Sequence, residues 1–193
     1  MLELKEKLKI ITIDQKYMKM LYSKCNQVFY LPKDYGKKPY IGILISENER
    51  EYAIPLTSAK EKHKFLKNCD NGRMLVLEYA SHEKIMKNGI FKEYPNGELK
   101  HILAVLMINK MIPIKKGVYS LVNINYCHED DLETNKYKTL LNKEYSFCVS
   151  HKEKILKIAN RIYTLQIEKG IVYKGHCDFK KLEKVCDSYK VNL

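Results

Sequence analysis

The sequence predicts an α+β fold in which an antiparallel sheet is built first and helices are added later. Short apolar runs separated by turn residues fill the first 124 positions, which is the pattern of strands. From Glu133 onward the apolar residues recur at helical spacing instead. No internal repeat or low-complexity linker divides the 193 residues, and a chain of this length buries about 70% of its unfolded surface. We therefore expect a single domain over residues 1–193.

The expected strands come in chain order. IITI (10–13) ends the first, and YIGILIS (40–46) and EYAIPL (51–56), joined by the polar ENER, form a hairpin. GRMLVLEYA (72–80) follows, then ILAVLMINKMIPI (102–114), which is apolar and interrupted at Pro113. GVYSLVNI (117–124) is the last. Residues 82–101 are polar, contain two Asn-Gly pairs, and predict an elaborated loop or hairpin.

Helices are expected between and after these strands. KYMKMLYSKC (16–25) places Met18 and Leu21 on one face, and residues 59–68 predict a short surface helix. Two later segments have clear amphipathic spacing: Ile155, Ile158, Ile162 and Leu165 before Gly170, and Phe179, Leu182, Val185 and Cys186 after an Asp178 cap. These helices are expected to lie against the sheet.

The charge of the chain suggests a polyanionic partner. Lys plus Arg number 35 against 23 acids, a net charge of +12. Only three are arginines, so contact with a phosphate backbone is favoured over reading of base edges. Fifteen tyrosines and five phenylalanines either fill the core or stack on unpaired RNA bases. No apolar run of membrane-spanning length occurs, and no helix combines a basic face with a broad apolar one, so a membrane partner is not expected.

Six cysteines occur without a C-x-x-C pair, and the charged N-terminus MLELKEKLKI does not resemble a signal peptide. We expect a cytoplasmic protein with reduced thiols. The adjacent pairs Cys127-His128 and His176-Cys177 lack the spacing of zinc ligand loops. Neither a metal nor another cofactor is therefore expected.

The stretch IPLTSAKEKH (54–63) has two interpretations. Ser58 and Glu61 fit the S-x-x-E capping box of an ordinary helix start. Alternatively, the free amides of that helix start, with the Thr57 and Ser58 hydroxyls, bind a phosphate. Lys60 and Lys62 favour the second, because cations in a first turn oppose the helix dipole unless an anion is present.

The available residue types limit the chemistry. No converging set of acids suits a two-metal nuclease, since Glu129–Asp131 and Glu133 are packed into one turn-like stretch, and no Walker loop is present. Metal-free RNA cleavage instead needs groups that take a proton, give a proton and stabilise phosphorane charge while the ribose 2′-OH attacks. Such chemistry implies RNA rather than DNA, because DNA lacks that nucleophile.

The block KKPYIGILISENEREYAIPLTSAKEKH (37–63) resembles the signature of the ToxN/AbiQ/CptN endoribonucleases, the toxins of type III toxin–antitoxin systems. KYMKML, NKMIPI (109–114) and GHCDFKKLE (175–183) extend the resemblance, in order, over about residues 13–186. It implies a strongly bent MazF/Kid-like antiparallel sheet with surrounding helices, and metal-independent RNA cleavage to a 2′,3′-cyclic phosphate. It also implies inhibition by a repeat RNA that the toxin cuts into pseudoknots, closed protein–RNA assemblies, and abortion of phage infection.

The resemblance also assigns residues. By this assignment Thr57 and Ser58 hold the scissile phosphate, Lys60 and Lys38 neutralise its charge, and His63 is a general acid or base. A second set would bind RNA: Tyr17, Tyr40, Lys62, Lys180 and Lys181. Two departures from the family are visible: Lys62 stands where an aromatic is expected, and residues 81–100 look longer than usual.

Two other functions remain open on the sequence. A non-catalytic basic RNA-binding module would use the same lysines and tyrosines without cleavage. A MazF-like toxin controlled by a protein antitoxin would share the fold but not the RNA inhibitor.

Overall fold

The structure is a computed structural model, and it describes residues 1–4, 7–30, 39–46, 49–67, 70–80 and 89–191. Over these residues nine antiparallel strands form one sheet, in the order β5-β7-β4-β3-β2-β9, with β1 on β3, β6 on β7 and β8 on β4. The strands are β1 (Leu2–Glu3), β2 (Lys9–Ile13), β3 (Tyr40–Ser46), β4 (Glu51–Ser58), β5 (Arg73–Tyr79), β6 (Phe91–Glu93), β7 (Leu99–Met107), β8 (Ile112–Ile114) and β9 (Tyr119–Leu121). The predicted α+β class is confirmed.

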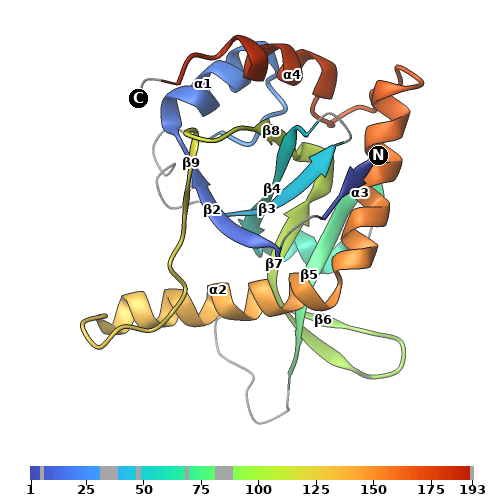
Figure 1. Cartoon of the computed structure of the whole chain (residues 1–193). Helices are drawn as coiled ribbons and strands as arrows, with labels where there is room; N and C mark the ends of the chain where they lie inside the picture. The colour runs from blue at the N-terminus through green and yellow to red at the C-terminus, as the bar shows by residue number, and fades with distance from the viewer. Residues whose placement is uncertain (5–6, 31–38, 47–48, 68–69, 81–88, 192–193) are drawn as a thin grey trace.

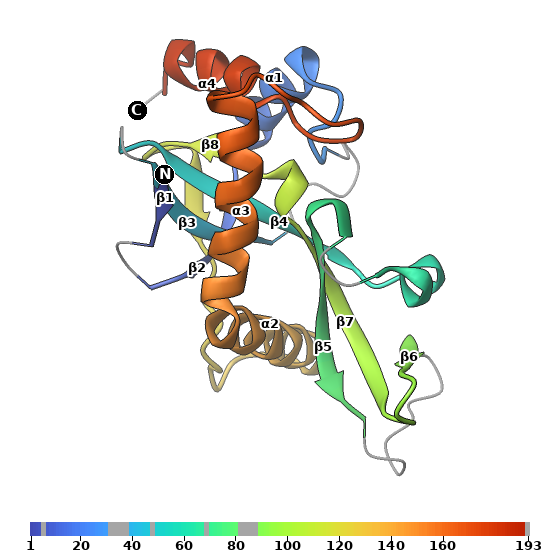
Figure 2. The ribbon, with the colours of Figure 1, turned by 90° about the vertical axis from the view of Figure 1, so that its right-hand side faces the viewer.

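Strand β4 is shared by two parts of the sheet, and the sheet bends along it. Its first part pairs with β3 on one side, in the predicted hairpin, and with β8 on the other. Its last three residues pair with β7 instead, with Thr57 opposite Val105 and Ser58 opposite Ala104. In Figure 2 the β5–β7 ladder consequently runs steeply across the direction of β2 and β3.

Four helices cover the sheet: α1 (Gln15–Lys24), α2 (Leu132–Ser150), α3 (Lys152–Ile167) and α4 (Phe179–Ser188). Figure 1 shows α1 and α4 together over one end, α2 across the opposite end and α3 along one side. Asp14, Asp131 and Asp178 cap α1, α2 and α4, each accepting a hydrogen bond from a first-turn amide. The cap predicted at Asp178 is thus confirmed.

One large core joins the sheet to the helices. Tyr17, Tyr40 and Tyr52 are fully buried in it, and the Tyr52 ring meets Phe179 of α4 edge to face with centroids 6.0 Å apart. Burying such a side chain stabilises the fold by roughly 1.5–3 kcal/mol. The late helices contact different parts of the sheet: α4 lies against β8, α2 against β5 and β7, and α3 against β1.

Two local predictions are wrong. The helix expected over 59–68 is only a 3-10 turn, η2 (Glu61–Phe65), because β7 keeps the chain extended to Ser58. The break in residues 102–114 lies at a 3-10 turn, η5 (Ile108–Lys110), whereas Pro113 sits inside β8 opposite Tyr52.

The polar segment 82–101 does contain a hairpin, since β6 pairs with β7 around a turn at Asn96-Gly97; residues 81–88 lie outside the described part. Among the described residues, no helix is long and apolar enough to cross a membrane.

Candidate functional site

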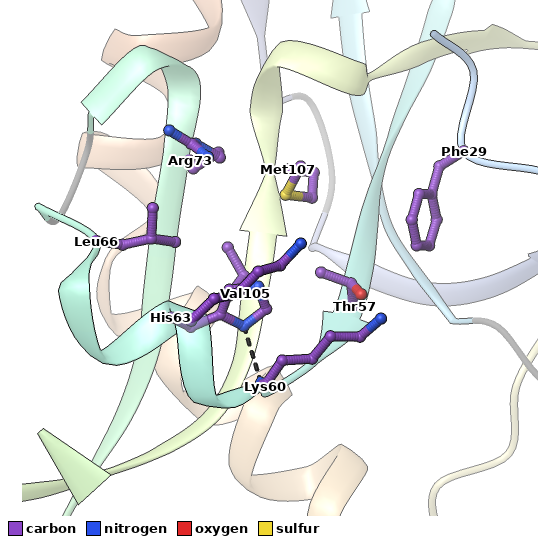
Figure 3. Close-up of a pocket in the computed structure, with 9 residues that line it drawn as sticks. Phe29, Thr57, Lys60, His63, Leu66, Arg73, Val105 and Met107 are labelled. Carbon is purple, nitrogen blue, oxygen red and sulfur yellow. Dashed lines mark hydrogen bonds between the residues drawn. The ribbon is translucent and has the colours of Figure 1, made fainter. Parts of the chain in front are cut away.

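A cavity of about 210 Å³ opens where β4 ends, beside β7 and the η2 turn. Side-chain alternation along β4 directs Thr57 into it, and the chain then turns through η2 so that later residues fold back over the same space. Figure 3 shows the Lys60 side chain extending past Thr57, with His63 and Leu66 on one side and Phe29 on the other. The cavity is therefore built largely by a short stretch of chain after the hairpin.

The residues that line the cavity are of two chemical kinds. Five are cationic or polar: Lys60, Lys62, Arg73, His63 and Thr57. Four are apolar: Phe29, Leu66, Val105 and Met107. A phosphate beside an unpaired base presents the same two characters, charge next to a flat apolar surface.

His63 is fixed in one tautomer by the backbone. The N–H of Lys60 donates to His63 Nδ1 at 3.0 Å, and the His63 N–H donates back to the Lys60 carbonyl at 2.8 Å. Because Nδ1 accepts, the proton of the neutral ring is on Nε2. Burial, with Lys62, Lys60 and Arg73 nearby, lowers the pKa of His63, so the ring is neutral at pH 7 and offers an N–H donor.

Arg73 is the charged cavity residue that sequence reasoning missed, and the four apolar lining residues were not predicted either. It begins β5 and reaches the cavity from across β7, although 13 residues separate it from Lys60. Its Nε is buried and has no hydrogen-bond partner. A buried guanidinium N–H without an acceptor is costly, so an anion in the cavity would satisfy it. The only sequence signal was that arginine is rare in this lysine-rich chain.

The predicted catalytic residues are brought together in part. Thr57, Lys60 and His63 line the cavity, as does Lys62 from the predicted RNA-binding set. Ser58 is exposed, and strand alternation directs it to the opposite face of β4 from Thr57. Lys38 lies outside the described residues.

Ser58 does not cap a helix. It pairs with Ala104 of β7, and the turn that follows is only five residues long. The helix on which the predicted phosphate site depended is therefore absent, and the polar groups that line the cavity belong to side chains.

Two predicted RNA-binding tyrosines are core residues. Tyr17 is fully buried, donates its hydroxyl to the Pro113 carbonyl at 2.8 Å, and packs edge to face on Tyr189. Tyr40 is equally buried, and its hydroxyl donates to the Phe29 carbonyl at 3.2 Å. Neither ring is accessible to a base, so these two assignments are corrected. Both rings instead fill the core, which is the alternative that the sequence left open for the tyrosines of this chain.

Lys180 and Lys181 lie at a different place, in the first turn of α4. Both are exposed, and with Lys184 and Asp178 they line a second cavity of about 230 Å³. Lys181 Nζ is 3.2 Å from the Asp178 carboxylate. These lysines share no lining residue with the cavity beside β4.

Two acids of the stretch 129–133 have structural roles. Asp130 forms an ion pair with Lys138 at 2.7 Å, and Asp131 caps α2. Over the described parts of the chain, no three His, Cys, Asp or Glu side chains gather in a way that could hold a metal ion.

The sequence of the chain matches the family model of the toxin ToxN, type III toxin–antitoxin system, over residues 9–187. The chain belongs to this ToxN family. Two ToxN-family relatives are named Endoribonuclease ToxN. That of Bacillus thuringiensis subsp. kurstaki is 26% identical over 96% of this chain and 86% of its own length. That of Pectobacterium atrosepticum is 25% identical over 92% of this chain and 91% of its own length.

Solved structures share the fold. A toxin from a study of selective inhibition by a non-coding RNA pseudoknot superposes with a TM-score of 0.67, at 22% identity, over 97% of this chain and 100% of that one. AbiQ, a lactococcal anti-phage endoribonuclease of the type III toxin–antitoxin system, gives a TM-score of 0.68 at 24% identity, over 94% of this chain and 97% of AbiQ. The open antiparallel sheet with its helices is thus the architecture of characterised toxins of this kind.

Proposed function

We propose that this ToxN-family toxin is an endoribonuclease that cleaves RNA in the cavity beside β4 without a divalent ion. The observation that carries the proposal is the convergence of Lys60, Lys62 and Arg73 with the Nε2–H of His63 on one small space. Three cations and a neutral donor suit a phosphate whose negative charge grows during reaction. The apolar residues that also line the cavity, Phe29 among them, suit the base next to that phosphate.

In the proposed reaction the ribose 2′-OH attacks the neighbouring phosphorus, and the 5′-oxygen of the next nucleotide leaves. The products are a 2′,3′-cyclic phosphate and a 5′-hydroxyl end. Thr57 Oγ1 donates to a non-bridging phosphate oxygen, and Lys60 and Arg73 offset the charge that develops on the phosphorane. Stabilisation by one such donor is worth about 10²–10³ in rate.

The tautomer of His63 decides its part in proton transfer. Nδ1 already accepts from the Lys60 amide, so the ring lacks a free basic nitrogen facing the cavity. His63 therefore donates a hydrogen bond to the phosphate, and as a neutral ring it neither takes the 2′-OH proton nor protonates the leaving 5′-oxygen. Another group or water takes the first proton and supplies the second.

Two assigned residues keep roles that rest on the family resemblance. Ser58, which is exposed on the face of β4 opposite Thr57, is proposed to contact the RNA backbone outside the cavity. Lys38 is proposed to neutralise the same phosphate. The proposed contacts of Lys180 and Lys181 are with RNA outside the cavity, because these lysines line a separate hollow.

We further propose that the inhibitor is an RNA pseudoknot cut from a repeat transcript and held in a closed protein–RNA assembly. Support comes from relatives: one related structure concerns toxin inhibition by a non-coding RNA pseudoknot, and another a bacterial antiviral system regulated by a processed non-coding RNA. AbiQ is an anti-phage enzyme, so abortion of phage infection is the proposed biological outcome. A MazF/Kid-like core is proposed on the bend that β4 introduces.

The test is cleavage of an end-labelled single-stranded RNA by purified protein in EDTA. We expect cleavage, with a 3′ product end that resists phosphatase until acid opens the cyclic phosphate. Lys60→Ala should reduce the rate at least a hundredfold, whereas Lys136→Ala, a matched loss of one exposed lysine on α2, should leave it within threefold. Intact RNA with the wild-type protein would favour the non-catalytic RNA-binding module. Inhibition only by a protein encoded next to the toxin would favour a protein antitoxin.

A further inference from the structure

A histidine that the proposed chemistry does not use holds the turn that leads into β5. His176 belongs to GHCDFKKLE (175–183), one of the segments that carry the family resemblance, and the residue is only 4% exposed. Its Nε2 lies 2.7 Å from the Oδ1 of Asn71. Asn71 is in η3 (Asp70–Gly72), and Arg73 of the cavity follows directly. Because an amide oxygen only accepts, the Nε2–H of His176 donates this hydrogen bond.

The turn has a backbone that few residues adopt. Asn71 and Gly72 have φ angles of +48° and +73°, so two consecutive residues are left-handed. Asparagine tolerates this conformation better than most residues, and glycine adopts it without strain. Gly72 is also closely packed, since a Cβ there would lie 2.6 Å from Ile162 Cδ1 and 2.9 Å from Asn109 Cβ. The chain that enters β5 is therefore fixed against α3 and η5.

His176 is itself anchored on two sides. Its N–H donates to the Tyr173 carbonyl at 3.0 Å, and the Tyr173 ring meets the imidazole edge to face with centroids 5.7 Å apart. The next residue, Cys177, donates its N–H to the Asn109 carbonyl at 3.0 Å. A ring held in this way gives its hydrogen bond to Asn71 a defined direction.

Arg73 depends on this turn because β5 is at the edge of the sheet. Over the described strands β5 ends the order, so Arg73 has a strand partner on one side only, Met107 of β7. Figure 3 shows Arg73 where the turn enters β5, and its side chain lines the cavity. A catalytic group displaced by about 1 Å can lose about 10² in rate, so the position of the turn matters to the reaction.

The junction of these segments lacks hydrogen-bond partners. In the described parts of the chain, four buried side-chain nitrogen or oxygen atoms have none, and three belong here: Arg73 Nε, Asn109 Oδ1 and His176 Nδ1. Each such atom costs stability, and local costs of this kind are concentrated at functional sites. The junction is therefore better explained by what it positions than by the stability it adds.

We propose that His176 and Asn71 are positioning residues, whose hydrogen bond fixes the turn before β5 so that the Arg73 guanidinium meets the scissile phosphate. The inference rests on the proposed RNA cleavage, in which Arg73 is a cavity cation. Neither His176 nor Asn71 lines the cavity. Their effect on cleavage should therefore pass through Arg73.

Four variants of the full-length protein test the contact by single-turnover cleavage of a labelled RNA. Asn71→Gly keeps the left-handed turn and removes Oδ1 from an exposed side chain, so the rate should fall about tenfold or more. His176→Leu is of similar size but has no donor, and it should match that loss. His176→Gln should stay within about threefold, because its amide N–H reaches the position of Nε2. Asn96→Gly is the matched control, since this exposed Asn96 Oδ1 accepts the Glu98 amide in the β6–β7 turn, and it should cleave as wild type does.

Two readouts separate positioning from a general loss of structure. Adding Asn71→Gly to Arg73→Met should lower the rate by less than about twofold beyond Arg73→Met alone, because both changes act through one side chain. The chain also has only three arginines, so their Nε–H groups give three NMR signals, and the one absent in Arg73→Met belongs to Arg73. That signal should shift in Asn71→Gly and His176→Leu but not in His176→Gln or Asn96→Gly.

Three results would overturn the proposal. They are an unshifted Arg73 signal in Asn71→Gly, a wild-type cleavage rate in Asn71→Gly, and rate losses of Asn71→Gly and Arg73→Met that multiply in the double variant. The NMR measurement does not require cleavage. A wild-type protein that cuts no RNA would therefore refute the proposed function, while the Arg73 signal would still show whether the turn positions this side chain.

Discussion

Replacing His63 by asparagine tests whether the ring acts in the reaction or only holds the turn. Asparagine Oδ1 stands as many bonds from the backbone as histidine Nδ1, so it can still accept the N–H of Lys60. It carries nothing at the position of Nε2, so the donor facing the cavity is lost. Alanine at the same place removes both groups, and the pair of variants therefore separates the two functions of the side chain.

The expected magnitudes follow from these contacts. His63→Asn should change the free energy of unfolding by less than about 1 kcal/mol, since the half-buried bond to Lys60 is preserved. His63→Ala leaves that amide without its acceptor and should cost about 1–2 kcal/mol, or about 2–8 °C in melting temperature for a chain of this size. Both variants should lose about 10²–10³ in cleavage rate, because both lack the Nε2 donor.

Single-turnover cleavage of a labelled RNA in EDTA measures the rate, and thermal unfolding followed by circular dichroism measures stability. The decisive sample is His63→Asn. If it melts as wild type does and cleaves within threefold of the wild-type rate, the donor role is refuted and His63 only stabilises η2. If it melts as low as His63→Ala, asparagine has not replaced the Nδ1 acceptor, and the premise that the two variants separate the two functions of the side chain is refuted.

Three further predictions concern other parts of the molecule. Arg73→Met should reduce RNA cleavage at least tenfold, by loss of a cavity cation, without destabilising the fold, because Nε has no partner to lose; an unchanged rate would remove Arg73 from the site. Tyr17→Phe should cost about 1–2 kcal/mol of stability, by loss of the hydroxyl bond to Pro113, and leave RNA affinity in a filter-binding assay unchanged; weakened binding at intact stability would restore its RNA role. Burial raises the pKa of Glu144 to about 7, above its value of roughly 4.3 in an unfolded chain, so its stabilising effect is complete at low pH and falls as the pH rises through 7. Urea unfolding should show up to about 3 kcal/mol lost between pH 5 and pH 8, and Glu144→Gln should abolish that component; equal pH slopes in both proteins would contradict it.

Local patterns predicted the elements well where neighbours in sequence are also neighbours in space. The hairpin of β3 and β4 and the capped helix α4 are of this kind, because turn chemistry, apolar spacing and a cap agree within a few residues. Residues 57–61 were misjudged for the opposite reason. Their S-x-x-E pattern favours a helix locally, but pairing with β7, more than 40 positions later, holds Thr57 and Ser58 in a strand. A distant partner decided between two locally acceptable conformations.

The same distinction applies to the cavity. Lys60 and His63 could be found because they lie in one motif, whereas Arg73, Phe29 and Met107 arrive from other elements and carry no signal of their own. The family resemblance assigns Tyr17 to RNA binding, but the exposure of a side chain cannot be read from a matching residue type. Only the packed fold shows that its ring is buried and its hydroxyl already bonded.

Because β4 is shared by two parts of the sheet, RNA cleavage is expected to depend on both parts staying folded. A strand shared by both parts of the sheet cannot detach from one without loosening the other, and Thr57 stands near where the two meet. Local opening at β4 is therefore expected to abolish RNA cleavage and to loosen both parts of the sheet. As temperature rises, the fraction of molecules still able to cut RNA should fall together with the fraction still folded, as a single cooperative curve.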